Sequence, residues 1–442
     1  MNSPVPELLP RNPLDAWAAA GLDIAGEQFT RAEIESRQWM RLAETVAWAK
    51  AHSPFYRRRL DNVDENALAS VEALRRLPFT TADDLRRNDP SLLCVSQSDI
   101  SRIVTLDTSG TSGPPKRLFF TPEDQEATID FFRHGMSVFT RPGDRVAILF
   151  PGERPGSVGD LLAQGLRRLG AEPIPVGWPQ DLAATAKRLR DERPDVVAGT
   201  PVAVLAVARH GAASGPLHVP RVLLSADHAA PSLRASLAEL WDCEIFEHYG
   251  MTEMGLGGGV DCAAHDGYHM RDNELLVEIV DPASDAALAP GQFGEVVVST
   301  LMRRGLPLIR YRTGDVSRVL PGPCACGSPL TRLDRIRGRL AAGVETGAGL
   351  LTMPTLDEAL FAQPEVVDFS ATWRGTPAQH LDLDISCLPG TGDPEVLRTA
   401  VIRIPVLARA VGERNVRLTL TVSCAHLHAR AGKRRIAVDN AA

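Results

Sequence analysis

The feature that most constrains the fold of this chain is a regular alternation of short apolar segments with helical patterns between residues 145 and 247. The apolar segments predict β-strands, at residues 145–150, 172–176, 195–199, 221–225 and 243–247. Helical patterns separate these strands, at residues 158–169, 179–191, 201–209 and 231–241. Strands that alternate with helices indicate a mainly parallel sheet covered by helices, and therefore an α/β fold. Ligands bind at the carboxyl ends of the strands of such a sheet, so we expect the chemistry of the chain in the loops there.

The sequence before and after this region has other patterns. Apolar residues recur at helical spacing over residues 31–50, whereas the first 30 residues show no clear pattern. From about residue 270 the chain becomes β-like, and we predict strands at 275–281 and 294–300.

The last hundred residues predict a separate, small α+β domain. A stretch rich in Gly and Ala at 338–352 predicts a hinge before it. Alternating apolar residues predict strands near 381–385 and 416–420, with a helix at 394–410 that Pro405 should kink or shorten. The expected domains are therefore residues 1–337 and residues 338–442.

Composition excludes several classes of protein. The chain has 442 residues, with 48 Lys and Arg against 55 Asp and Glu and a net charge of −7, which argues against a nucleic-acid-binding protein. No apolar run approaches the roughly 18–20 residues that span a bilayer. The N-terminal residues lack the pattern of a secretory signal, and seven cysteines are too few for a disulfide scaffold. We therefore expect a cytoplasmic protein.

The most informative loop is the segment TLDTSGTSGPPKRLFFT at residues 105–121. It places small and hydroxyl side chains before Lys116, namely Thr108, Ser109, Gly110, Thr111, Ser112 and Gly113. Small residues let backbone N–H groups approach phosphate oxygens, the hydroxyls add donors, and the lysine adds a point charge. The segment does not fit the Walker A pattern. A flexible Ser/Gly linker is the alternative, but a linker would not end in Pro-Pro-Lys and continue directly into an apolar strand.

This loop closely resembles the phosphate loop of the adenylate-forming superfamily, which contains acyl-CoA synthetases, adenylation domains and luciferases. Three further segments match the motifs of that superfamily in the same order, namely EHYGMTE (247–253), LIRYRTGDV (308–316) and AGKRRIAVD (431–439). Others resemble the phenylacetate–CoA ligase branch, namely FYRRRLD (55–61), LPFTTADDLR (77–86) and DRIRGR (334–339). The resemblance implies a large N-terminal adenylation domain at 1–337 that binds ATP and an acid, and a small, mobile C-terminal domain at 338–442.

The resemblance also implies an activity. Such an enzyme uses ATP to convert a carboxylic acid, by preference an aryl acid, into an acyl-adenylate and then transfers the acyl group to a thiol. CoA is the default acceptor, and the phosphopantetheine arm of a carrier protein or an amine is the alternative. The branch also contains homodimers. A degenerate member that binds nucleotide or acyl ligand without turnover is the alternative from another class.

Four residues are implied to take part in catalysis. Thr252 would donate to the α-phosphate and Glu253 would hold Mg²⁺, a hard cation that prefers carboxylate oxygen. Lys433 would reach the carboxylate and the α-phosphate, and Lys116 would contact the outer phosphates. For Glu253 the alternative is a solvated loop carboxylate, and for Lys433 it is a solvated basic tail shared with its neighbours.

The resemblance also implies which residues bind the nucleoside. Tyr249 would cover the adenine, and Asp315 would accept the ribose hydroxyls. Further nucleotide contacts are expected from Ser225, Ala226, Asp227, Glu247, Gly250 and Arg339. Asp315 could instead be a turn residue and Arg339 a surface arginine.

Cysteines and histidines make a second constellation. Cys324 and Cys326 follow the Asp315 segment, and Cys262 follows the Glu253 segment. Together with a histidine they could form a tetrahedral Cys₃His site for structural Zn²⁺. His269 is favoured because DGYH resembles a segment of the branch, and His265 is its rival. Three buried thiols with a surface histidine are the alternative.

One part of the chain, the hinge, departs from the family pattern. Another part, the acid-binding pocket, carries no motif that defines the substrate. After Arg339 the sequence reads Leu-Ala-Ala-Gly where the branch has acidic residues, so the first half-reaction is better supported than the second. The acid-binding pocket is expected from four mainly apolar segments, at 131–136, 151–160, 225–230 and 251–259. An apolar pocket favours an aromatic or other apolar acid.

Overall fold

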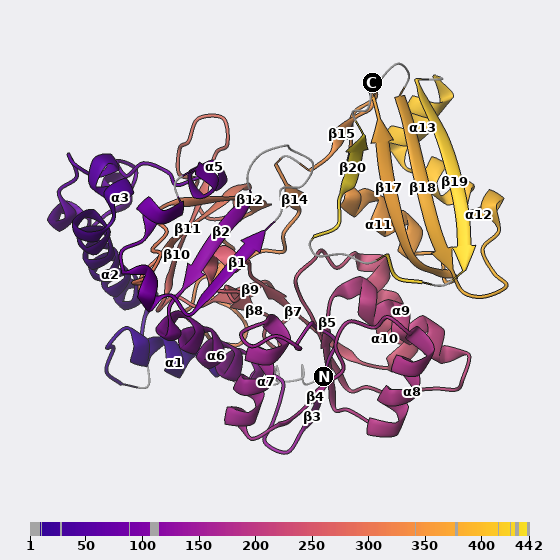
Figure 1. Ribbon diagram of the computed structural model, residues 1–442, viewed down its shortest axis with the longest axis horizontal. Helices are drawn as coiled ribbons and strands as arrows, with labels where there is room; N and C mark the ends of the chain where they lie inside the picture. Colours follow the sequence, from indigo (N-terminus) through magenta and orange to yellow (C-terminus); the bar gives the residue numbers. More distant parts are fainter. Residues whose placement is uncertain are drawn as a thin grey trace, which may run out of the picture. The chain divides into compact units, whose positions relative to one another are not determined.

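The predicted alternation of strands and helices is present in the computed structural model of the chain. The structure describes residues 9, 11–26, 29–87, 89–106, 115–340, 342–375, 379–413, 415–424, 426–428 and 433–439. The chain forms two units (Figure 1). Unit 1 comprises residues 1–142, 164–170 and 247–337, and unit 2 comprises residues 143–163, 171–246 and 338–442.

The parallel sheet of the predicted α/β region lies in unit 2, in the order β6-β5-β3-β4. Its strands are β3 (Arg145–Ile148), β4 (Glu172–Pro175), β5 (Val196–Gly199) and β6 (Arg221–Leu224). The helices between them are α7 (Val158–Leu169), α8 (Leu182–Glu192), α9 (Pro201–Ala212) and α10 (Pro231–Trp241). Every residue of β5 is buried, which explains why this strand reads as a continuous apolar run. Helix α7 and strand β7 (Glu244–Tyr249) each continue from unit 2 into unit 1.

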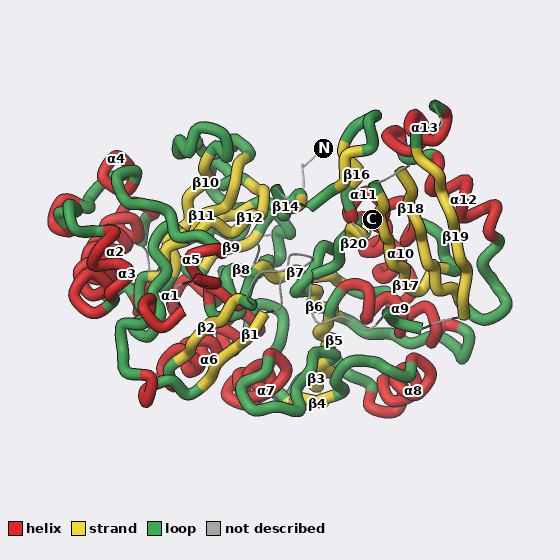
Figure 2. Tube along the Cα trace, turned by 45° about the horizontal axis from the view of Figure 1, so that its top comes forward, coloured by secondary structure: helices red, strands yellow, loops and turns green. Residues whose placement is uncertain are grey.

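The C-terminal part of unit 2 is a four-stranded mixed sheet with helices beside it (Figure 2). Its strands are β17 (Val366–Arg374), β18 (Gln379–Cys387), β19 (Val416–Cys424) and β20 (Ile436–Asp439), in the order β19-β18-β17-β20. Its helices are α11 (Met353–Phe361), α12 (Pro394–Ile402) and α13 (Pro405–Gly412). The expected helix at 394–410 is therefore two helices. Pro405 begins the second one, because proline lacks an N–H and fits the first turn of a helix.

The glycine-rich stretch at 338–352 contains three two-residue strands, β14 (Gly338–Arg339), β15 (Val344–Glu345) and β16 (Leu350–Leu351). Beyond it, the C-terminal sheet and the parallel sheet share one hydrophobic core. The guanidinium of Arg209 on α9 strengthens that packing by donating to the carbonyl oxygens of Phe361, at 2.6 Å, and Val366.

Unit 1 contains the N-terminal helices and three antiparallel sheets. The helices are α1 (Leu14–Gly21), α2 (Arg31–His52), α3 (Pro54–Arg59), α4 (Val71–Leu74), α5 (Ala82–Arg87) and α6 (Pro122–Met136). The first 30 residues, which showed no pattern, thus contribute α1, whose apolar residues Leu14, Ala18 and Ala19 are buried.

The strands of unit 1 bring together segments that are far apart in the sequence. They are β1 (Arg102–Leu106), β2 (Lys116–Phe120), β8 (Gly259–Val260), β9 (Tyr268–Met270), β10 (Leu275–Val280), β11 (Gly294–Thr300), β12 (Tyr311–Ser317) and β13 (Arg332–Leu333). They pair as β1-β2, as β10-β11-β12 and as β13-β9-β8-β7. Short 3₁₀ turns complete the unit, at Glu65–Ala67, Asp89–Leu92, Gln97–Asp99 and Thr252–Met254. No described helix is both long enough and apolar enough to cross a membrane.

Candidate active site and metal centre

Lys116, Glu253 and Tyr311 meet in unit 1. Lys116 is the first residue of β2, and its Nζ forms an ion pair with Glu253 Oε1. Tyr311, the first residue of β12, donates to the same oxygen at 3.1 Å. Burial alone would raise the pKa of Glu253, but Lys116 and the hydrogen bond from Tyr311 hold it below its ordinary value. Glu253 is therefore a buried, ionised carboxylate in the structure.

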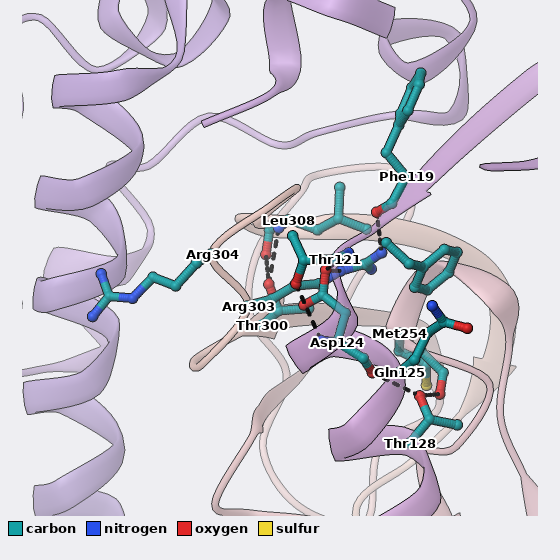
Figure 3. A network of polar contacts seen from close by, with 12 residues as sticks. Phe119, Thr121, Asp124, Gln125, Thr128, Met254, Thr300, Arg303, Arg304 and Leu308 are labelled. Atoms are coloured by element: carbon teal, nitrogen blue, oxygen red, sulfur yellow. Dashed lines mark hydrogen bonds and ion pairs between the residues drawn. The ribbon is translucent and has the colours of Figure 1, made fainter. Parts of the chain in front are cut away.

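Two buried arginines fix the turn that carries Glu253. Arg303 donates to the carbonyl oxygen of Glu253 at 2.7 Å and to that of Phe119 at 3.0 Å. Arg271 donates to the carbonyl oxygen of Met254. Figure 3 shows Arg303 directed toward Phe119 and the first turn of α6, whereas Arg304 points away. Sequence reasoning missed both buried arginines, because neither lies inside a motif segment.

The expected adenine and ribose residues also meet in unit 1. Tyr249 ends β7, and its hydroxyl donates to Asp315 Oδ2 at 3.0 Å. The backbone N–H of Asp315 donates to Thr313 Oγ1 at 3.0 Å, which fixes this residue on β12. Asp315 is fully buried, and the Tyr249 hydroxyl already occupies one of its carboxylate oxygens.

Glu247, a further expected nucleotide residue of unit 1, lies beside a cation. The hydroxyl of Tyr268 donates to Glu247 Oε2 at 3.3 Å, and Arg335 Nη1 lies 3.7 Å from Glu247 Oε1. Arg335 also donates to Asp261 at 2.6 Å. Burial lowers the pKa of Arg335, but Glu247, Tyr268 and Asp261 outweigh burial and raise it above its ordinary value.

The remaining predicted residues lie elsewhere or are not described. Thr108, Ser109, Gly110, Thr111, Ser112 and Gly113 lie outside the described residues. Gly250 and Thr252 flank Met251 in unit 1, beside Tyr249 and Glu253. Ser225, Ala226, Asp227, Arg339 and Lys433 belong to unit 2.

Within unit 2 the expected residues fall into two groups. Ser225, Ala226 and Asp227 follow β6, and Asp227 accepts the backbone N–H of His228 at 2.9 Å and that of Arg434 at 3.0 Å. Arg339 and Lys433 are exposed. Lys433 directly precedes Arg434, whose backbone N–H contacts the loop of Asp227.

The expected metal ligands form a buried cluster in unit 1. One ligand atom each of Cys262, His269, Cys324 and Cys326 lies within 4.8 Å of all the others. Cys262 Sγ is 3.7 Å from Cys324 Sγ, and Cys326 Sγ is 3.4 Å from His269 Nε2. Three sulfurs and an imidazole nitrogen at this spacing are a donor set typical of a closed tetrahedral site.

Two further contacts bear on which histidine belongs to the cluster. His265, the rival ligand, lies instead with Nδ1 3.0 Å from Asp261 Oδ2. Burial alone would lower the pKa of His269, but Cys324 and Cys326 raise it to about 9. Thiolates at these positions would place negative charge at the centre of the cluster, where a cation could bind.

Aromatic side chains fill part of the segments expected to bind the acid. Phe131 and Phe132 on α6 lie with their ring centroids 5.8 Å and 6.3 Å from the ring of His248. A Cβ on Gly257 would lie 2.2 Å from the Phe131 ring, so only glycine fits there. Burial lowers the pKa of His248 to about 4, so its imidazole is neutral at pH 7. This group of residues is aromatic and uncharged.

Comparisons with known proteins identify the family of the chain. The AMP-binding enzyme family matches residues 101–302. The phenylacetate-coenzyme A ligase of Thermus thermophilus is 30% identical over 77% of this chain and 78% of its own length. That of Escherichia coli is 31% identical over 70% of this chain and 71% of its own length. A solved structure of 2-hydroxyisobutyryl-CoA ligase with its acyl-adenylate has a TM-score of 0.76 at 22% identity, over 93% of this chain and 90% of that chain.

Proposed function

Because the chain belongs to the phenylacetate–CoA ligase branch of the adenylate-forming enzymes, and is an AMP-forming acid–CoA ligase, we propose which of its residues do the chemistry and which acid it takes. The enzyme activates a carboxylic acid with ATP to an acyl-adenylate and then transfers the acyl group to CoA. The observation that carries the proposal is the buried, ionised Glu253 between Lys116 and Tyr311.

Glu253 is the proposed ligand for Mg²⁺. It is an anion in a buried turn, and a carboxylate oxygen is the donor that this hard cation prefers. The ion would neutralise charge on the phosphate oxygens. Lys116 neutralises Glu253 in the free enzyme, and it turns to the outer phosphates when ATP binds. Thr252 donates to the α-phosphate, and the backbone N–H groups of residues 108–113 cradle the other phosphates.

The nucleoside is proposed to bind at the Tyr249–Asp315 pair. The Tyr249 ring covers the adenine, and Asp315 accepts the ribose hydroxyls once the tyrosine hydroxyl has moved. The adenine edge is read by Glu247 and by Ser225, Ala226 and Asp227, and Gly250, which directly follows Tyr249, contributes its backbone. Arg339 assists at the ribose.

In the first half-reaction an oxygen of the acid carboxylate attacks the α-phosphorus, and the bond to pyrophosphate breaks. Negative charge builds on the α-phosphate oxygens, and the ammonium of Lys433 stabilises it. In the second half-reaction the CoA sulfur attacks the acyl carbon and AMP leaves. We propose that residues 338–442 act as a mobile domain between the two steps and that residues 1–337 bind ATP and the acid.

The acid is proposed to be aromatic. Phe131, Phe132 and the neutral imidazole of His248 form an aromatic, mainly apolar group, with the guanidinium of Arg271 5.2 Å from the Phe131 ring centroid. Because Gly257 has no Cβ, the Phe131 ring can pack directly against its backbone. An aryl group could stack there, as aromatic pairs prefer offset or edge-to-face contact.

The cysteine cluster is proposed to hold structural Zn²⁺. Cys262, Cys324 and Cys326 would supply thiolates and His269 its Nε2. The donor set leaves no open position for a substrate, so the ion would cross-link strand β9 with the segments after β8 and β12 rather than act on the acid.

The proposed partners are the acid, ATP and CoA, and a cytoplasmic location follows from the need for both cosubstrates. A carrier protein or an amine as acceptor, and a homodimer, stay predictions. A binder without turnover would lack acid-dependent exchange altogether.

The test is ATP–pyrophosphate exchange by purified protein with Mg²⁺, across a panel of aryl and alkyl acids. We expect exchange that depends on the acid and is strongest with aryl acids. Addition of CoA, then of amines, identifies the acceptor by the acyl product. The residue assignment would be wrong if Lys433→Ala exchanged as fast as the wild type.

A further inference from the structure

One carboxylate contacts a described residue before Lys433 and the residue directly after it. Before it, the backbone N–H of His428 donates to Asp368 Oδ2 at 2.9 Å. After it, Arg434 Nη2 lies 3.4 Å from Asp368 Oδ1. Asp368 lies on β17 and is only 2% exposed. His428 and Arg434 are thus both attached to the same strand.

The side chain of Arg434 occupies a built pocket in the C-terminal sheet. Its Nη1 forms an ion pair with Asp357 on α11, and its Nη2 donates to the carbonyl oxygen of Phe369 at 2.9 Å. The guanidinium lies 4.9 Å from the ring centroid of Phe361 and 4.3 Å from that of Phe369. Only 6% of this side chain is exposed, so Arg434 is no part of a solvated tail.

The backbone of Arg434 makes a second attachment. Its N–H donates to Asp227 Oδ2 at 3.0 Å, in the loop that follows β6. Asp227 is one of the residues proposed to read the adenine edge, so this bond joins the lysine segment to the nucleotide loop within unit 2. The peptide that precedes this N–H ends in Lys433.

Lys433 differs from Arg434 in exposure. The side chain of Arg434 is turned into the sheet, whereas its neighbours Lys433 and Arg435 are both exposed. A long lysine side chain has four rotatable bonds, so fixing its backbone removes much of the freedom that would otherwise oppose one productive geometry.

We infer that Arg434 is a positioning residue for Lys433: clamped by Asp357 and Asp368 and tied to Asp227, it sets the place from which the lysine reaches the reacting phosphate. The inference rests on the role proposed for Lys433. It predicts that Arg434 matters for adenylation and not for thioester formation, because only the first half-reaction uses the lysine.

The first experiment separates the half-reactions. In Arg434→Met we expect ATP–pyrophosphate exchange to fall roughly 10- to 100-fold, since small misplacements of a catalytic group are costly. Thioester formation from presynthesised acyl-adenylate and CoA should change less than about twofold by the same reasoning. Arg434→Lys keeps the charge without the planar fork and should recover part of the exchange. Equal losses in both half-reactions, or full exchange in Arg434→Met, would overturn the inference.

A double-mutant cycle asks whether Arg434 acts through the lysine. If it does, adding Arg434→Met to Lys433→Ala should produce no further loss of exchange. A multiplied loss would show an independent role. The matched control is Arg374→Met on β17, because Arg374 also contacts two carboxylates, Asp382 and Asp439, and pairs with the last residue of β20. It should leave both half-reactions unchanged.

NMR of methylated lysines requires no turnover. It therefore still tests the inference if a variant folds poorly or if the wild type proves inactive. The chain has four lysines, at 50, 116, 187 and 433, so reductive methylation with ¹³C gives few signals to assign. We expect the Lys433 methyl signal to move and sharpen in Arg434→Met, and in the milder Asp357→Asn, but not in Arg374→Met. An unmoved signal would overturn the inference. An inactive wild type with the expected shifts would instead contradict the proposed function alone.

Discussion

At the scale of single residues, lysine is scarce in this chain: only four of its 48 basic residues are lysines. Two of the four, Lys116 and Lys433, occupy proposed phosphate-contacting positions. Arginine side chains instead donate to buried backbone carbonyl oxygens, as in Arg271, Arg303 and Arg434. The difference has a physical reason. The planar guanidinium holds several acceptors in one fixed geometry, whereas an ammonium on a flexible stem can move between partners.

Glu253→Gln should abolish the proposed metal role with little change in shape. The amide keeps the volume and one acceptor oxygen but loses the charge that binds Mg²⁺. We expect kcat for exchange to fall on the order of 10²- to 10³-fold, as for removal of a major electrostatic contact. The Mg²⁺ concentration for half-maximal rate should rise. A variant with the wild-type Mg²⁺ dependence would contradict the assignment.

At the scale of elements, the active-site turn depends on a side chain from a distant loop. In Arg303→Met the carbonyl oxygens of Glu253 and Phe119 lose their buried donor. Each unsatisfied buried group costs about 1–3 kcal/mol, so we expect the free energy of unfolding to fall by roughly 2–4 kcal/mol. Denaturant unfolding of the variant and the wild type measures this difference in free energy. The neighbouring Arg304→Met is the control, because Arg304 is exposed and should change stability by less than about 0.5 kcal/mol.

The cysteine cluster joins strand β9 to the segments after β8 and β12, so its occupancy should affect stability. We expect about one equivalent of zinc in the purified protein, and a lower unfolding temperature after chelation. Cys324→Ser should lose the metal and reproduce the chelated protein. Cys424→Ser, at an exposed cysteine, should retain it. Zinc-free wild type from zinc-supplemented cultures would contradict the proposal.

At the scale of the whole molecule, burial of His248 should make stability depend on pH. Its pKa is lowered to about 4 from 6.5 by burial, so the unfolded chain binds a proton that the folded chain does not. The stabilisation is fully present above pH 6.5 and is lost as the pH falls through 4. Between pH 6.5 and 4, the free energy of unfolding of His248→Gln should therefore fall less than that of the wild type. His52→Gln, at an exposed position, is the control and should behave as the wild type.

The fold class and most elements could be predicted from the sequence because they depend on short-range patterns. Helices α7 and α10 and strand β11 match their predicted ranges, since burial of one face imposes a period that can be counted along the chain. Helix α1 was missed because its pattern is short. The break at Pro405 was anticipated, but only the structure shows that a second helix begins there.

The motif residues of the candidate site could likewise be named from the sequence, but not their partners. Lys116 and Glu253 are 137 residues apart, and Tyr311 and Glu253 are 58 apart. The Cys₃His set could be proposed from residue types, whereas the contact of His265 with Asp261 could not. From the sequence, Arg434 could belong to a solvated basic tail. The tertiary structure shows its guanidinium beside the carboxylates of Asp357 and Asp368.

By itself, then, the sequence determined the alternation of strands and helices, the family and the residues that carry its motifs, because these depend on local periodicity and on short spacings. Only the tertiary structure decided which buried carbonyl, carboxylate or thiol each long side chain meets, and so which arginines support the turn of Glu253 and the segment of Lys433. Those partners are set by the packing of elements that lie far apart along the chain, and no local pattern encodes the packing.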